Sequence, residues 1–343
     1  MTRAPRLFIK SRRRSLRNFF RNSPTEAILL IVLAVVCLIL TVATDQFLTL
    51  VNLANLLNAS AINIIFAVGL VVVLIAGGID ISFAVAASVV QYVTVYVLAY
   101  FGGGNWLLGF LIAGSLGIGL GLINAFLIHY FRIISIVVTI ATFNAFFGLL
   151  MFITSGRYLY NLPDWWTTRI ILVEHQTASG RWAELTLPVA VMVVASIATW
   201  FLIRMTTTGR QLYAFGDNPE GARRVGINVA AMQAIAFGWA GMMAGIAGLM
   251  QVNFVQEVVP NALMGRELDV LAAVVLGGAR LGGGKGSVLG CILGVMLIAI
   301  IQNGLNLLGI SPFAFKMIVG AFILIAITLS NISFANFNFG RRT

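Results

Sequence analysis

The chain has 343 residues, of which 60 % are hydrophobic and only 10 % are charged, and its formal net charge is +11. Soluble domains carry roughly 25 % charged residues, so this composition excludes an ordinary water-soluble enzyme and predicts a protein of the lipid bilayer. The basic residues are not interleaved with aromatic residues, and we therefore interpret the positive charge as a sign of topology and of attraction to anionic lipid rather than to nucleic acid. Cys37 and Cys291 lie in apolar runs without metal or disulfide spacing, which is typical of packing residues.

Apolar runs of about 20 residues, the length that crosses a bilayer, recur along the chain. They predict an all-α polytopic membrane protein with about ten transmembrane helices in one domain, residues 26–331, between a basic arm (1–25) and a tail (332–343). The predicted spans are Glu26–Thr44, Asn58–Ala76, Ile81–Phe101, Trp106–Tyr130, Ile134–Ser155, Leu185–Ile203, Val229–Phe254, Ala262–Gly278, Ser287–Leu308 and Phe313–Ser330.

The N-terminal arm carries eight basic residues, and cytoplasmic segments hold an excess of lysine and arginine. The arm therefore predicts a cytoplasmic N-terminus, and ten spans return the C-terminus to the same side. This orientation places the polar loop 204–228 in the cytoplasm and the loop 156–184 outside. The apolar run after the arm is of full length and lacks a convincing cleavage site, so we expect it to be a retained first span.

Between the first two spans, Asn52, Asn55 and Asn58 recur at three-residue spacing, which predicts an interfacial helix with one polar stripe over Asp45–Asn58. The aromatic residues of the external loop, among them Trp165 and Trp166, favour an aromatic belt at the membrane interface, with a docking surface for an external protein as the alternative.

The sequence GGIDIS, Gly77–Ser82, lies between the second and third predicted spans. Gly77 and Gly78 permit backbone angles that other residues resist, and Asp80 is placed to cap the following helix. One interpretation is a plain corner between two helices. The other is a flexible gate or hinge at the cytoplasmic mouth.

Most polar residues inside the spans are amides, which suit the donors and acceptors of a hydroxyl-rich solute. Our candidates for the lining of a translocation cavity are Asn63, Asn124, Asn144, Asn253 and Asn303. The alternative for each is a hydrogen bond between helices. Glycine pairs at helical spacing, such as Gly117 with Gly121, Gly241 with Gly245 and Gly290 with Gly294, predict close approach of helix backbones.

The cytoplasmic loop contains a turn at Asp217, Asn218 and Pro219. Asp217 or Asn218 is placed to cap a short helix that includes Arg223 and ends near Gly226. A short charged helix parallel to the membrane suits a groove on a moving partner. A surface helix held on lipid phosphates is the alternative.

The eighth predicted span is interrupted by Arg266, Glu267 and Asp269, which leave only Val270–Gly278 fully apolar. This pattern indicates a half-helix or a re-entrant segment. The positions of Arg341 and Arg342 favour a segment that crosses, with its beginning in a polar vestibule. The following GGGKGS, Gly282–Ser287, lacks the spacing of a phosphate-binding loop, because Ala279 and Gly286 occupy two of its required positions.

Three ordered motifs resemble one protein family: GGIDIS at Gly77, AFGDNPEGARRVGI at Ala214–Ile227, and GRELDVLAAVVLGGARLGGGKGSVLG at Gly265–Gly290. They are similar to those of permease subunits of ribose-type bacterial ABC importers, a group that includes permeases for monosaccharides and for the autoinducer-2 sugar derivative. The resemblance extends over about residues 26–330. It departs at Ala84, where the family motif usually has glycine.

The resemblance implies a ten-helix permease fold in the bacterial inner membrane and alternating access during import of a monosaccharide or similar solute. It implies three partners: a second permease copy or homologue, a periplasmic sugar-binding protein, and a cytoplasmic ATPase, often two units fused in tandem, which holds ATP and magnesium. The chain itself is expected to bind no cofactor and to have no ATPase motif. The implied contacts with the ATPase are Tyr213, Asp217, Asn218, Pro219, Glu220, Ala222, Arg223 and Gly226.

Two other classes of protein remain as alternatives. A stand-alone sugar facilitator or secondary transporter would need no helix for a partner ATPase and would work without nucleotide. A polytopic membrane enzyme would need a cluster of catalytic carboxylate, histidine or cysteine residues at one face, and the sequence offers none: His129 and His175 are assigned to opposite sides.

Overall fold

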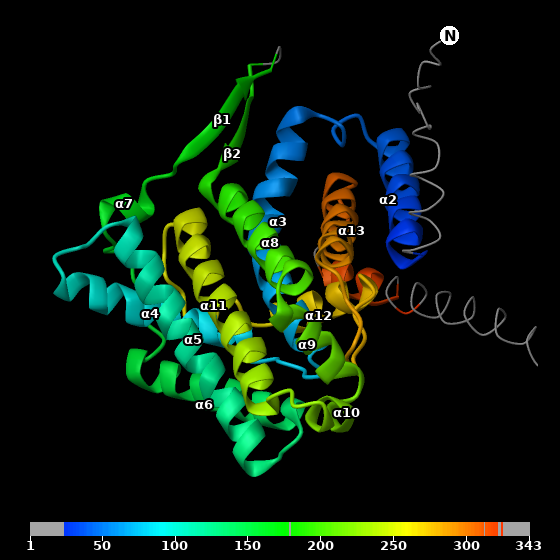
Figure 1. Ribbon diagram of the computed structural model, residues 1–343. Helices are drawn as coiled ribbons and strands as arrows, with labels where there is room; N and C mark the ends of the chain where they lie inside the picture. Colours follow the sequence, from blue (N-terminus) through cyan, green and yellow to red (C-terminus); the bar gives the residue numbers. More distant parts are fainter. Residues whose placement is uncertain (1–23, 178–179, 312, 322–323, 325–343) are drawn as a thin grey trace, which may run out of the picture.

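The computed structural model describes residues 24–177, 180–311, 313–321 and 324, and it is mostly helical (Figure 1). The predicted basic arm, up to residue 23, and the predicted tail 332–343 lie outside the described residues. Of the tenth predicted span, residues 313–321 and 324 are described as helix, and the others lie outside the described residues.

Eight helices of the described chain are long and apolar enough to cross a membrane. They are α2 (Pro24–Ala43), α3 (Leu50–Ile75), α4 (Phe83–Tyr100), α5 (Trp106–Phe131), α6 (Ser135–Thr154), α8 (Leu187–Met205), α11 (Val229–Val255) and α13 (Val288–Leu307). Each corresponds to one of the predicted spans. The eighth predicted span differs, because it contains only the 11-residue helix α12 (Arg266–Leu276).

Helix α3 forms the centre of the molecule, surrounded by α8, α11, α12 and α13 (Figure 1). Its residues from Ile64 to Ile75 are all buried, since this half of the helix is apolar on every side. The predicted glycine contacts are confirmed at two helix pairs. A Cβ atom on Gly117 of α5 would overlap the carbonyl oxygen of Gly241 on α11, and one on Gly290 of α13 would overlap that of Gly277 at the end of α12.

The external loop contains regular structure that corrects the all-α prediction. After the short helix α7 (Asp164–Thr167), strands β1 (Ile171–Gln176) and β2 (Trp182–Thr186) form an antiparallel hairpin that projects from the molecule (Figure 1). Polar and apolar residues are mixed in β1, all of whose residues are exposed. Such a strand lacks the clean alternation that makes a half-buried strand recognisable in a sequence.

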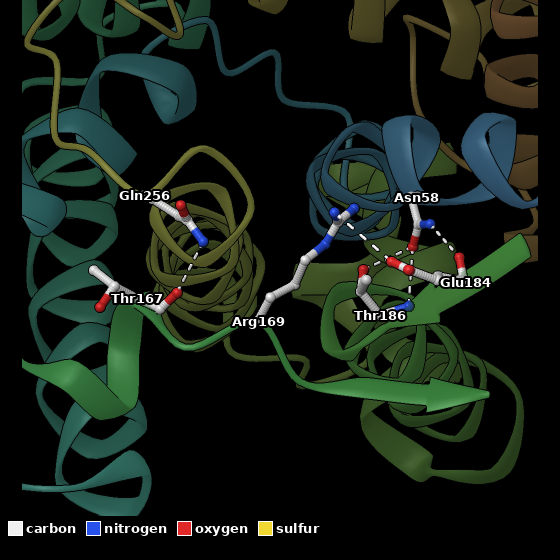
Figure 2. A network of polar contacts seen from close by, with 6 residues as sticks. All are labelled: Asn58, Thr167, Arg169, Glu184, Thr186 and Gln256. Carbon is white, nitrogen blue, oxygen red and sulfur yellow. Dashed lines mark hydrogen bonds and ion pairs between the residues drawn. The ribbon is translucent and has the colours of Figure 1, made fainter. Parts of the chain in front are cut away.

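Polar side chains attach this external segment to the spanning helices (Figure 2). The side-chain oxygen of Asn58 on α3 accepts from both the backbone and the hydroxyl of Thr186, at 3.1 and 2.7 Å, and its amide donates to the carbonyl of Glu184 at 2.7 Å. Before β1, the carbonyl of Thr167 in α7 accepts from the side chain of Gln256, the residue after α11, at 3.0 Å. The hairpin is therefore anchored at its base.

The predicted interfacial helix over Asp45–Asn58 is wrong. Thr49 caps α3, and the helix continues from Leu50 through the predicted second span without a break. Asn52 and Asn58 are buried in contacts with other elements, whereas Asn55 is exposed. The three-residue spacing of the amides predicted a polar stripe that faces lipid headgroups. The residues that bury Asn52 and Asn58 are distant in the sequence, so the local spacing did not indicate them.

The predicted aromatic belt is wrong for its two central tryptophans. Trp166 is 0 % exposed, and its indole donates to the carbonyl of Leu249 at 2.9 Å. Trp165 stacks against Trp166 and donates to the carbonyl of Gly103. These residues fasten α7 to α11 and to the loop before α5, because an indole N–H removed from water requires an acceptor.

Candidate functional site

On the face opposite the hairpin, the polar segment after α8 folds into two short helices, α9 (Thr207–Asp217) and α10 (Pro219–Arg224) (Figure 1). Asn218 caps α10 by accepting from the backbone of Gly221 at 2.9 Å, Pro219 occupies its first turn, and Gly226 follows it with φ of +85°. The short helix predicted in this loop is confirmed, with Asn218 rather than Asp217 as its cap. The sequence did not predict α9.

Six of the eight residues predicted to contact an ATPase are exposed on this surface: Asp217, Asn218, Pro219, Glu220, Arg223 and Gly226. The other two face the protein. Ala222 is 3 % exposed, and the hydroxyl of Tyr213 donates to the carbonyl of Gly286 at 2.7 Å. Burial raises the pKa of Tyr213, so its hydroxyl keeps the proton that this hydrogen bond requires.

The three motifs that carry the family resemblance meet in space directly behind this surface. The backbone of Gly284 donates to the carbonyl of Ile75, the last residue of α3, at 2.9 Å. A Cβ atom on Gly216 would overlap that same carbonyl oxygen, and one on Gly283 would lie 2.8 Å from the Cα of Gly77. The end of α9 therefore contacts the end of the central helix through backbone atoms, without an intervening side chain to absorb movement.

The corner between α3 and α4 is fixed by polar contacts. Asp80, 2 % exposed, accepts from the backbone and the hydroxyl of Ser82 at 2.8 and 2.7 Å. The prediction that Asp80 caps α4 is wrong, because Ser82 occupies the capping position and makes no side-chain cap. The chain of contacts continues from Ser82 to Asn124 of α5 at 2.8 Å, and from Asn124 to Thr142 of α6 at 2.7 Å. Of the predicted hinge residues, Gly77 has a positive φ of +81°, whereas Gly78 does not.

The half-helix α12 lies on a segment that crosses the molecule. Gln256 is bonded to α7 on the hairpin face, and Gly284 is bonded to the end of α3 on the α9 face. Between these two residues lies α12, whose 11 residues give a helix about 16 Å long, roughly half the thickness of a bilayer core. The half-helix interpretation is thus confirmed, and a non-helical stretch, residues 256–265, completes the passage.

Charged residues gather where α12 begins. The guanidinium of Arg266 donates to the side-chain oxygen of Asn63, near the middle of α3, at 3.2 Å. Asp269 interacts electrostatically with Arg266 and with Lys316 in the helical residues 313–321. Asn63 was among the predicted site residues, whereas Lys316 was not. Its position inside the predicted tenth span was the signal, because a charge within a span is unusual.

The five predicted cavity amides occupy different surroundings. Asn124 bridges Ser82 and Thr142, and Asn253 donates to the carbonyls of Trp166 and Thr168, so both connect elements. Asn144 is exposed on α6, and Asn63 contacts Arg266. Asn303 of α13 forms a two-way amide pair with Asn52 of α3, at 2.9 and 3.0 Å. These five side chains therefore do not form one continuous lining.

The surface is hollowed at both ends of the helices. A pocket of about 530 Å³ lies beside α10 and is lined by Arg223, Arg132, His129 and Gln233 among others. A second pocket, of about 650 Å³, lies at the hairpin end and is lined by Asn52 and Asn303 together with Gln46, Asn55 and Asn306. Gln46, Asn55 and Asn306 were not among the predicted site residues. The spacing of Asn52 and Asn55 had predicted an interfacial helix instead.

Comparisons with known proteins agree with this architecture. Residues 52–327 match a family described as the permease component of the branched-chain amino acid transport system. The chain belongs to this family. It is 31 % identical over 317 residues to the ribose import permease protein RbsC of Escherichia coli K12. The matched region covers 88 % of this chain and 92 % of the relative.

Other relatives extend the same relationship. The chain is 34 % identical to a probable ABC transporter permease protein of Sinorhizobium fredii, over 88 % of both chains. It is 29 % identical to the autoinducer 2 import system permease protein LsrC of Photorhabdus luminescens, over 87 % of both. No solved structure matches the chain. The chain is a multi-pass membrane protein and the permease component of an ABC importer, homologous to bacterial inner-membrane permeases.

Proposed function

We propose that this permease imports a monosaccharide or a similar small polyhydroxylated solute, using energy from a separate cytoplasmic ATPase that binds α9 and α10. A second permease copy or homologue completes the pathway, and a periplasmic sugar-binding protein delivers the solute. ATP and magnesium bind to the ATPase, and this chain contributes no hydrolysis and no cofactor site. The spanning domain is proposed to have ten spans and both termini in the cytoplasm.

The observation that carries this proposal is the direct backbone contact between α9 and the end of α3. A partner that moves the exposed residues of α10 displaces Gly216, which abuts the carbonyl of Ile75. Since α3 contacts α8, α11, α12 and α13, its displacement reaches three of the other seven described spans and the half-helix α12. Such a lever suits alternating access, in which two packed states open the pathway to opposite sides.

The solute class rests on the relatives named for ribose and autoinducer 2 and on the amides that line the pocket at the hairpin end. The family description mentions branched-chain amino acids, and a zwitterionic amino acid needs a carboxylate partner for its ammonium group as well as a cation for its carboxylate. The pocket at the hairpin end contains Arg181 but no acidic residue. This composition favours a neutral hydroxylated solute.

Replacement of Arg223 by glutamate tests the coupling role. The side chain is exposed on α10, so the change is expected to leave membrane insertion intact while it lowers solute-stimulated ATP hydrolysis and uptake. Arg157→Glu is the matched control, because it makes the same charge change at an exposed position on the hairpin face. Equal activity of both variants and the unaltered protein would count against α10 as the coupling element.

Purification of the tagged protein from its native membrane in mild detergent tests the partners. Mass spectrometry is expected to identify a soluble ATPase, and a second permease in the same complex would indicate a heterodimer. A stand-alone facilitator predicts the opposite result: purification without an ATPase, and uptake into vesicles that does not depend on nucleotide.

A further inference from the structure

The pocket at the hairpin end is formed by elements that are far apart in the sequence. It has a volume of about 650 Å³, within the range of small-molecule sites, which is roughly 300–1,000 Å³. It is lined by residues at the beginning of α3 and the end of α13, and by Thr177 and Arg181 of the hairpin. Its lining residues are Gln46, Thr49, Leu50, Val51, Asn52, Asn55, Thr177, Arg181, Asn303, Asn306 and Leu307.

The amide groups of this pocket fall into two kinds. Asn52 and Asn303 bond to one another, and Asn52 also donates to the carbonyl of Phe47 at 2.9 Å. They join α3 to α13 and give the pocket a fixed polar wall. Asn55 and Asn306 are exposed, and within the described part of the chain their side chains make no hydrogen bond. Their donors and acceptors are thus available to a ligand.

The charge of the lining limits the ligand. Arg181 is the single charged residue among the lining residues, and Asp and Glu are absent from them. Cations and ammonium groups therefore lack a counter-charge. Side-chain amides offer both donors and acceptors, as hydroxyl groups do, so the lining matches a neutral solute with several hydroxyl groups.

We infer that this pocket is an entry site for a monosaccharide, in which Asn55 and Asn306 bind solute hydroxyl groups and the Asn52–Asn303 pair holds the two helices at the distance that the solute requires. The inference rests on the proposed function and adds to it the place where the solute first contacts the permease. Asn55 and Asn306 are the specificity-determining residues of this site.

Saturation-transfer difference NMR on the full-length protein in lipid nanodiscs tests the site, because this method detects weak binding. The probes are D-ribose, D-xylose and D-galactose, with L-leucine for the amino-acid alternative. At least one monosaccharide is expected to give a signal with the unaltered protein. In the variant Asn55→Leu with Asn306→Leu, affinity is expected to fall about tenfold or more, because two hydrogen bonds are lost.

Asn261→Leu is the matched control, since Asn261 is exposed on the loop before α12 and outside the pocket lining. The control is expected to keep the signal. Gel filtration and thermal unfolding establish that each variant is folded, which is expected because neither Asn55 nor Asn306 bonds to another element. An equal signal from all variants, a signal from leucine alone, or no signal from any monosaccharide would overturn the entry site.

Nucleotide-dependent uptake of the bound monosaccharide into vesicles separates this inference from the proposed function. If the double variant has an unchanged KM and its uptake still depends on ATP, the entry-site inference is wrong and the proposed function stands. If binding is lost in the double variant but uptake by the unaltered protein does not depend on nucleotide, the entry site stands and the proposed coupling to an ATPase is wrong.

Discussion

Single glycines determine how closely the parts of this permease approach one another. Gly216 lies against the carbonyl of Ile75, and Gly284 bonds to that same carbonyl. The sequence identified the segments that contain these glycines as motifs, but it gave no reason for them to touch. Their function as contact points follows from the absence of a side chain at a place where three backbones meet.

Replacement of Gly216 by alanine is expected to destabilise the protein by about 1–3 kcal/mol, because the new methyl group has to displace the backbone of α3 or of Gly284. The free energy of unfolding in mixed detergent micelles measures the effect. Gly119→Ala is the control, since a Cβ atom on Gly119 of α5 would meet no atom within 4 Å. Similar unfolding free energies for the two variants would contradict the close contact at Gly216.

Asp80 shows what a sequence can and cannot say about one residue. Its position in GGIDIS marked it as important, and a cap was the simplest local explanation. The structure instead connects Asp80, through Ser82, to α5 and α6. A hydrogen bond to a residue 42 positions away has no signature in local sequence.

Among the elements, the amide pair of Asn52 and Asn303 connects α3 to α13. Asn303→Leu leaves the side-chain oxygen of Asn52 without its donor, and Asn52→Leu leaves the amide of Asn303 without its partner. Each replacement is expected to cost about 1–3 kcal/mol of unfolding free energy. The double replacement is expected to cost less than the sum of the single ones, because no amide is then left unpaired.

Unfolding of the two single variants and the double variant in mixed micelles provides this comparison. Asn144→Leu is the control, because the amide of Asn144 donates to its own helix, at Ile140, and not to another element. Strict additivity of the two replacements would mean that the pair contributes no coupling between α3 and α13.

Helices α9 and α12 differ in how well the sequence indicated them. The charges at Arg266, Glu267 and Asp269 predicted a shortened eighth segment, and α12 begins at Arg266. By contrast, α9 begins in a run of threonines and contains two glycines, residues of low helix propensity. Burial of Leu212 and Phe215 against the rest of the protein stabilises it, and such tertiary packing overrides propensity.

At the scale of the whole molecule, the predicted orientation places α9 inside the cell and the hairpin outside. Cysteine labelling with a membrane-impermeant maleimide on intact spheroplasts checks it. Arg181→Cys is expected to react, and Arg210→Cys only after the membrane is permeabilised. Both positions are exposed, Arg181 directly before β2 and Arg210 in α9, and these two elements lie at opposite ends of the molecule (Figure 1). The native Cys37 and Cys291 are half-buried and buried, and the unaltered protein measures their background. Labelling with the reverse pattern would invert the topology.

The sequence by itself determined that the protein spans a membrane and which family it belongs to. It also determined, to within a few residues, where the eight full-length spans begin and end, except for the beginning of α3. These features depend on composition, on the length of apolar runs and on local motifs, which are properties of adjacent residues. Only the tertiary structure decided that the three motifs meet behind α9, that α12 is completed by a non-helical stretch, and that Asn52 pairs with Asn303. These features depend on contacts between residues distant in the chain, whose energies a local pattern does not record.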